Sequence, residues 1–146
     1  MEFLTCVVAA EEDEYSDVGQ SNAPLNEWSG IESPGLDTTK IATLHSLLTG
    51  DSLQMALDLY EPVFVTEGED ETLVLRIDGE MMEELALLDE EALEHVAAEL
   101  VATEVYEHEE TDLDDIQAFL SAFSELAQLA ESQGQSLFVW IKLLQD

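Results

Sequence analysis

The chain has 146 residues, 46% of them hydrophobic, which predicts one domain with a core of its own rather than a disordered chain. The charge is extreme, because 35 Asp and Glu residues face only three Lys and Arg residues, for a formal net charge of −32 at pH 7. This composition argues against direct binding to nucleic acid or to an anionic membrane, since both need clusters of basic residues to neutralise phosphates.

Cys6 is the single cysteine, so no disulfide can form within the chain, which is typical of a protein from a reducing cytoplasm. The first ten residues are largely apolar, but they contain Glu2, lack a basic residue and form too short an apolar run for a secretory signal. We therefore expect a first strand there. No apolar run is long enough to span a membrane, and we expect a cytoplasmic protein.

Hydrophobic runs and turn residues alternate in the first half of the chain. The predicted elements are a strand at Phe3–Ala9, a polar loop at about 11–36, a helix capped near Thr38 and closed by Gly50, a short helix at Ser52–Tyr60, and strands at Pro62–Thr66 and Thr72–Ile77. The loop is predicted from its glycines and prolines, with Trp28 as a plug over the core. The two later strands either pair as a hairpin or lie apart in the sheet.

The second half begins with a helix that Asp78 caps, and Asp89 restarts or kinks it. Thr111 then caps the longest amphipathic helix, whose apolar residues recur every three or four positions until Gly134. The segment Ser136–Leu144 is rich in apolar and β-prone residues. We expect it to form a buried or central strand against which the long helix packs.

The order of the predicted elements is strand, helices, two strands, helices, strand. This order predicts a mixed α/β (α+β) fold, in which a small sheet is flanked by helices and the chain ends in a long amphipathic helix and a hydrophobic C-terminal strand. We expect residues 1–146 to form a single compact domain.

Several segments of the sequence are similar to a known family. Leu44-His-Ser-Leu-Leu-Thr-Gly50 resembles the L-H-x-L-L-T-G segment of the YfbM-like bacterial domain family, which has no assigned function. Leu73-Val-Leu-Arg-Ile-Asp78 resembles a strand of that family, and Leu137-Phe-Val-Trp-Ile141 resembles its terminal strand. The resemblance covers the chain from about Asp37 onward. It implies a small cytoplasmic α/β domain and supplies no chemistry.

Catalytic motifs are absent from the sequence. It contains no phosphate-binding glycine loop, no paired cysteine motif and no zinc-binding histidine pair, so we expect neither an enzyme nor a bound cofactor or metal. We interpret His45 as a histidine at the edge of the core whose ring bonds a backbone carbonyl, and with Trp28 it marks a candidate pocket. His95 is one helical turn from both Glu91 and Glu99, which predicts an ion pair on a helix surface.

Two acidic runs are candidates for a surface that binds a partner, because each presents carboxylates to an Arg- and Lys-rich surface. The predicted partner-binding residues are Glu67, Glu69, Asp70, Glu71, Glu104, Tyr106, Glu107, Glu109, Glu110, Asp112, Asp114 and Asp115. Asp78 and the acids from Glu80 to Glu99 add an acidic helical flank, and Tyr60 and Tyr106 are candidate aromatic anchors. Helix capping and solvation are the alternative explanation for any one run.

The leading functional hypothesis is an immunity or inhibitor protein that neutralises a basic toxin or enzyme by electrostatic occlusion of its active site. One alternative is a DNA-mimic regulator of a DNA-binding protein. Another is an acidic housekeeping domain with a small-molecule pocket near His45. The charge is also explained by a solvated surface that promotes solubility, as in salt-adapted organisms.

Overall fold

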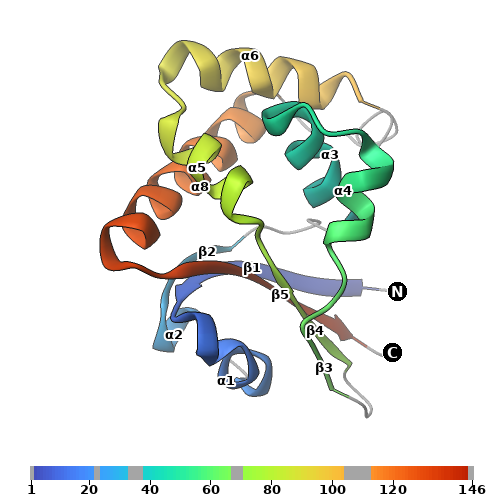
Figure 1. The fold of residues 1–146 in the computed structure, drawn as a ribbon, viewed down its shortest axis with the longest axis vertical. Coiled ribbons are helices and arrows are strands. Elements are labelled where there is room, and N and C mark those ends of the chain that lie inside the picture. The colour runs from blue at the N-terminus through green and yellow to red at the C-terminus, as the bar shows by residue number, and fades with distance from the viewer. Residues whose placement is uncertain (1, 22–23, 33–37, 67–70, 104–112, 145–146) are drawn as a thin grey trace.

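The computed structural model describes residues 2–21, 24–32, 38–66, 71–103 and 113–144. Its elements are β1 (Glu2–Ala10), η1 (Glu12–Glu14), α1 (Tyr15–Gln20), α2 (Pro24–Glu27), β2 (Ser29–Glu32), α3 (Thr38–Thr49), α4 (Leu53–Leu59), β3 (Phe64–Val65), β4 (Thr72–Arg76), α5 (Gly79–Leu87), α6 (Glu90–Val101), α8 (Leu113–Gln133) and β5 (Ser136–Leu144). One sheet has helices on both of its faces, which confirms the predicted mixed α/β class (Figure 1). No helix in these ranges is long and apolar enough to cross a membrane.

The sheet has five antiparallel strands in the order β2-β1-β5-β4-β3. Its centre is β5, where Trp140 lies opposite both Cys6 of β1 and Val74 of β4. This position confirms the prediction that Ser136–Leu144 is a central strand. The strands β3 and β4 pair with each other, so the hairpin alternative is correct.

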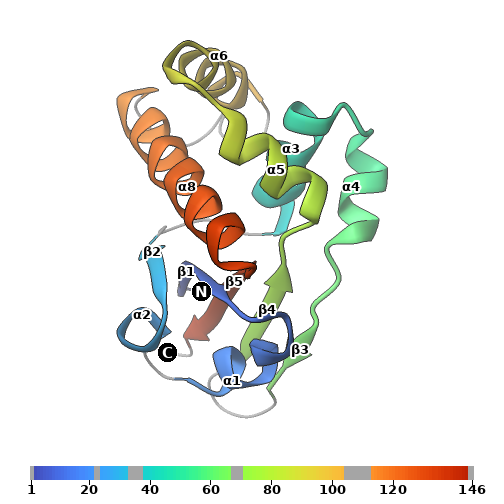
Figure 2. The same cartoon turned by 60° about the vertical axis from the view of Figure 1, so that its left-hand side comes forward.

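Side chains alternate along β5, so this strand contributes to two cores. Leu137, Val139 and Ile141 belong to the larger core, which lies under α3, α5, α6 and α8. Phe138 and Trp140 belong to a smaller core on the opposite face of the sheet. Figures 1 and 2 show α1 and α2 on that opposite face, away from the other helices.

The helix α8 has one buried stripe that packs over the sheet. Leu120, Phe123 and Ala127 are fully buried on this stripe, at the three- and four-residue spacing of one helical face. Gly134 follows with a φ of 68°, a left-handed conformation that ends the helix at low steric cost. The predicted long helix and its glycine stop are therefore confirmed, while its predicted cap, Thr111, lies outside the described residues.

The polar loop predicted at about 11–36 is wrong for the residues described there, which form η1, α1, α2 and the edge strand β2. These elements are short, and their sequences contain no long periodic pattern of apolar residues. Tertiary contacts stabilise them instead. A Cβ added at Gly19 would lie 2.0 Å from the Phe64 ring, and one at Gly30 would lie 2.3 Å from the Val7 carbonyl oxygen. The two glycines thus permit close packing within folded elements, whereas the sequence pattern suggested turns.

Side-chain caps set the starts of the middle helices. The Ser52 hydroxyl accepts the Met55 N–H at 3.3 Å, and the Asp89 carboxylate accepts the Ala92 N–H at 2.7 Å. Asp89 therefore restarts the chain as a separate helix, α6, rather than kinking a continuous one.

The buried thiol of Cys6 predicts a loss of stability at alkaline pH. Burial raises its pKa from 9.0 to about 12, and the Glu32 carboxylate adds to the rise. The folded protein therefore keeps the thiol proton at a pH where the unfolded chain loses it. The stabilisation is complete below pH 9.0 and is lost as the pH rises toward 12.

We expect the wild type to lose up to about 1.4 kcal/mol of unfolding free energy per pH unit above this threshold. Cys6→Ala should give a flatter pH dependence, because alanine has no proton to lose. Urea unfolding in steps from about pH 8 to pH 10 measures both slopes. Equal slopes in the two proteins would show that the thiol does not cause the loss.

Candidate functional site

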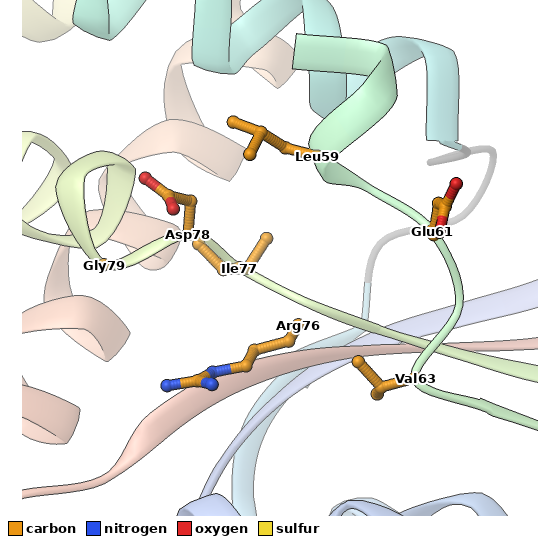
Figure 3. A pocket seen from close by; sticks show the side chains of 7 residues that line it. All are labelled: Leu59, Glu61, Val63, Arg76, Ile77, Asp78 and Gly79. Carbon is orange, nitrogen blue, oxygen red and sulfur yellow. The ribbon is translucent and has the colours of Figure 1, made fainter. Parts of the chain in front are cut away.

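A pocket of about 280 Å³ opens where the end of α4 faces the junction of β4 and α5 (Figure 3). Its lining residues are Leu59, Glu61, Val63, Arg76, Ile77, Asp78 and Gly79. They come from three stretches of the chain: the end of α4, the segment that enters β3, and the segment that leaves β4. The fold brings these stretches together because β3 pairs with β4.

The walls of the pocket are partly apolar and partly acidic. Leu59 is 52% exposed and Val63 is 41% exposed, although both are large aliphatic residues. Figure 3 shows the carboxylates of Asp78 and Glu61 on opposite sides of the opening. The pocket therefore combines aliphatic surface with two groups that attract cations.

Arg76 also lines the pocket, but its charge is directed elsewhere. It lies opposite Phe138 in the sheet, so its side chain belongs to the face of the smaller core. Its Nη1 lies 2.9 Å from Glu12 Oε1, and Figure 3 shows its guanidinium below the ribbon of β4, whereas the Asp78 carboxylate lies above it. Arg76 therefore does not neutralise the carboxylates of Asp78 and Glu61.

A buried chain of polar side chains lies behind the pocket. His45 is fully buried, and its Nε2 lies 2.9 Å from Asp51 Oδ2 while its Nδ1 lies 3.0 Å from Tyr60 Oη. The Asp78 N–H donates to the same Tyr60 oxygen at 3.3 Å, and Met81 Sδ lies 3.2 Å from that oxygen. The chain connects α3 and the turn after it with the end of α4 and the start of α5.

A neutral imidazole satisfies this chain with one arrangement of protons. His45 Nε2–H donates to Asp51, the Tyr60 O–H has His45 Nδ1 and Met81 Sδ as its acceptors, and the Tyr60 oxygen accepts the Asp78 N–H. Burial raises the pKa of Tyr60 above its ordinary value of 10.0, so Tyr60 stays a phenol at neutral pH. The chain has a structural role, because it holds the backbone of Asp78 at the edge of the pocket.

The prediction that the His45 ring bonds a backbone carbonyl is therefore wrong, because the ring bonds two side chains. The turn after Gly50, which has a φ of 84°, returns Asp51 to the helix that carries His45. The candidate pocket at His45 and Trp28 is not formed, since the two residues lie on opposite sides of the sheet. Trp28 packs on the smaller core, as a plug would, and its Nε1–H donates to Glu14 at 3.3 Å.

A larger acidic surface continues from the pocket along α5 and α6. We define the α5–α6 acidic surface by its exposed residues Glu80, Glu83, Glu84, Asp89, Glu90, Glu91, Glu94 and Glu99. The sequence from Glu80 to Glu99 contains no lysine or arginine. His95 Nε2 lies 3.0 Å from Glu99 Oε1, which confirms the contact predicted between them. Leu87 is 77% exposed at the end of α5, within this acidic surface.

The structure describes only part of the predicted partner-binding set. Asp114 and Asp115 are exposed in the first turn of α8, and Glu71 is half-buried before β4. The remaining residues, Glu67, Glu69, Asp70, Glu104, Tyr106, Glu107, Glu109, Glu110 and Asp112, lie outside the described residues. Tyr60, suggested as an aromatic anchor on the surface, is buried.

Sequence reasoning missed the pocket between α4 and α5. It treated Leu59 as part of an apolar helix and Asp78 as a helix cap, and Asp78 does accept the Glu80 N–H at 3.1 Å. A pocket built from separate stretches has no signal in local periodicity. Within the described ranges, no group of three or more His, Cys, Asp or Glu residues could hold a metal ion.

Comparisons with known proteins give one solved structure that is similar to this chain. It is the crystal structure of YfbM, a protein of unknown function from Escherichia coli, with 12% sequence identity and a TM-score of 0.45. The match covers 96% of this chain and 99% of that chain. No family model matches the chain, and the search of curated proteins finds no match.

Proposed function

We propose that this protein is an immunity or inhibitor protein that binds a basic toxin or enzyme and occludes its cationic active site, without catalysing a reaction itself. The observation that carries the proposal is the α5–α6 acidic surface, whose carboxylates are exposed and which has no lysine or arginine. Leu87 adds an exposed apolar residue to this surface. Burial of an apolar side chain in the interface slows dissociation of a complex that charge attraction has formed.

Electrostatics supports fast and selective association. The three basic residues of the chain do not offset the field of this surface, because Arg76 pairs with Glu12, Lys40 is buried, and Lys142 lies on β5. A uniformly acidic face steers a cationic partner toward it, and its carboxylates replace the phosphates of that partner's substrate. Such steering weakens as salt is added, because the Debye length falls to about 8 Å at physiological ionic strength.

The first experiment is to isolate the tagged protein from its own cells at low salt and to identify what elutes as salt is raised. The proposal requires one basic protein that elutes stoichiometrically and whose activity the acidic chain inhibits when both are purified. Recovery of the tagged protein alone, with the tag at either end, would contradict it.

Association kinetics with that partner then tests the surface. Replacing Glu91 and Glu94 of α6 with glutamine should lower the association rate constant at low salt by about tenfold and flatten its salt dependence. The matched control is D13N/D17N, which removes the same charge from exposed positions in η1 and α1, far from α6 (Figure 1). Equal effects of the two variants would show that net charge alone controls association.

The acidic run at Glu107, Glu109 and Glu110 is tested in the same assay by changing all three residues to glutamine. Slower association of this variant would show that the interface includes these three residues as well as α6. Competition with duplex DNA distinguishes the modes of inhibition, since a partner that releases this protein when DNA is added uses its DNA-binding site for both.

A further inference from the structure

We propose that the pocket between α4 and α5 receives an arginine side chain of the basic partner. This inference rests on the proposed function and assigns it a specific recognition point. It differs from the α5–α6 acidic surface, because the pocket is concave, partly apolar and built from three stretches of the chain.

The apolar walls fit the stem of a long basic side chain. Leu59 and Val63 leave aliphatic surface exposed, and Ile77, which is 2% exposed, forms the floor between them. Arginine carries three methylene groups below its charge, and such stems are commonly buried along apolar surface while the charged end stays at the opening. The pocket volume of about 280 Å³ is below the roughly 300–1,000 Å³ of sites for drug-sized ligands, which favours a single side chain.

The acidic groups fit the guanidinium. The carboxylate of Asp78 is oriented by the Glu80 N–H that it accepts, and the backbone of Asp78 is fixed by Tyr60. Glu61 lies on the other side of the opening (Figure 3). A guanidinium presents five N–H donors in one plane and is weakly hydrated, so it suits an acidic opening beside apolar walls better than an ammonium does.

The pocket is preformed rather than assembled on binding. The chain from Asp51 through His45 and Tyr60 to the Asp78 N–H holds its rear wall, and the β3–β4 pairing holds the strand beside it. A pocket that is rigid before binding loses little conformational entropy when a side chain enters, and such pockets hold the residues that contribute most to interfaces.

The probe is Nα-acetyl-arginine amide, titrated into isotope-labelled full-length protein and followed by amide NMR. We expect saturable shifts at the amides of Leu59, Glu61, Ile77 and Gly79. Nα-acetyl-citrulline amide, which has the same shape without the charge, should bind at least about tenfold more weakly, because its neutral ureido group forms no ion pair with the carboxylates. Equal binding of the two compounds, or shifts spread evenly over acidic surfaces, would overturn the assignment.

Two double variants make the test specific to the pocket. E61Q/D78N removes its charges, and asparagine at position 78 keeps the helix cap, so the fold should be preserved. This variant should bind the arginine probe about tenfold more weakly than the wild type does. The control E83Q/E84Q removes the same charge from the exposed face of α5 and should leave the probe affinity within about twofold.

The two proposals fail in different ways. If a basic partner is isolated but E61Q/D78N binds it as tightly as the wild type does, the pocket assignment is wrong and the proposed function stands. If the arginine probe binds in the pocket but no basic protein is inhibited, the proposed function is wrong while the pocket remains a guanidinium site. If neither binds, both are wrong.

Discussion

Replacing Phe123 with alanine should lower the free energy of unfolding by about 3–5 kcal/mol. Phe123 is fully buried in α8 and is among the largest side chains of the larger core. Alanine would remove its contacts with the residues beneath the helix and leave a cavity, because a close-packed core relaxes only partly around a lost ring. Urea unfolding at physiological salt, where the charge repulsion is partly screened, measures the loss.

Phe119 provides the matched control for this change. Its ring lies 5.4 Å from that of Phe123, but Phe119 is only half-buried. Phe119→Ala should therefore cost clearly less than Phe123→Ala, since the vacated space is open to water. A similar cost for both, or a loss below about 1 kcal/mol for Phe123→Ala, would show that α8 does not pack as described.

Replacing Tyr60 with phenylalanine should lower the free energy of unfolding by about 1–3 kcal/mol. The ring remains, so the loss comes from the hydroxyl, which serves both His45 Nδ1 and the Asp78 N–H. Both groups would be left without this partner in a buried region, where unsatisfied polar groups are costly. Tyr15→Phe, at an exposed tyrosine, is the control and should change stability by less than about 0.5 kcal/mol.

The stability difference between wild type and Tyr60→Phe should depend on pH. Burial raises the pKa of Tyr60 above 10.0, so the folded protein retains a proton that the unfolded chain releases. The contribution of the phenol is complete below pH 10.0 and falls as the pH rises above it. The two unfolding free energies should therefore converge in strongly alkaline buffer, and a constant difference would show that the phenol proton is not involved.

The same variant links the buried chain to the pocket. Without the Tyr60 hydroxyl, the Asp78 backbone loses the group that fixes it. We therefore attribute the shape of the pocket to residues that do not line it, namely His45, Asp51 and Tyr60.

The long regular elements could be predicted from the sequence because their physical basis is local. The apolar stripe of α8, the stop at Gly134 and the β-prone residues of β5 all act within their own segments. The segment containing Gly19 and Gly30 could not be predicted in this way. Its short helices and its edge strand depend on contacts with Phe64 and Val7, which are far away or on another strand.

The site shows the same difference between local and long-range information. The acidic character of α5 and α6 is visible in the sequence, since each residue carries its charge wherever it lies. The pocket depends on Leu59 and Asp78 facing each other across a gap, and the partners of His45 depend on where a turn directs Asp51. Neither arrangement leaves a periodic trace in the chain.

The central position of β5 has a consequence for how the molecule is made. A ribosome synthesises this strand after every other strand of the sheet, yet both β1 and β4 depend on it as a neighbour. Until β5 emerges, only the strand pairs β1–β2 and β3–β4 of this sheet can form, because the edges of β1 and β4 that pair with β5 lack their neighbour. Folding must therefore finish after translation has passed β5, through contacts between distant parts of the chain that form slowly. During that interval the large negative charge keeps the nascent chains apart, because like-charged chains repel one another before their exposed edges can pair.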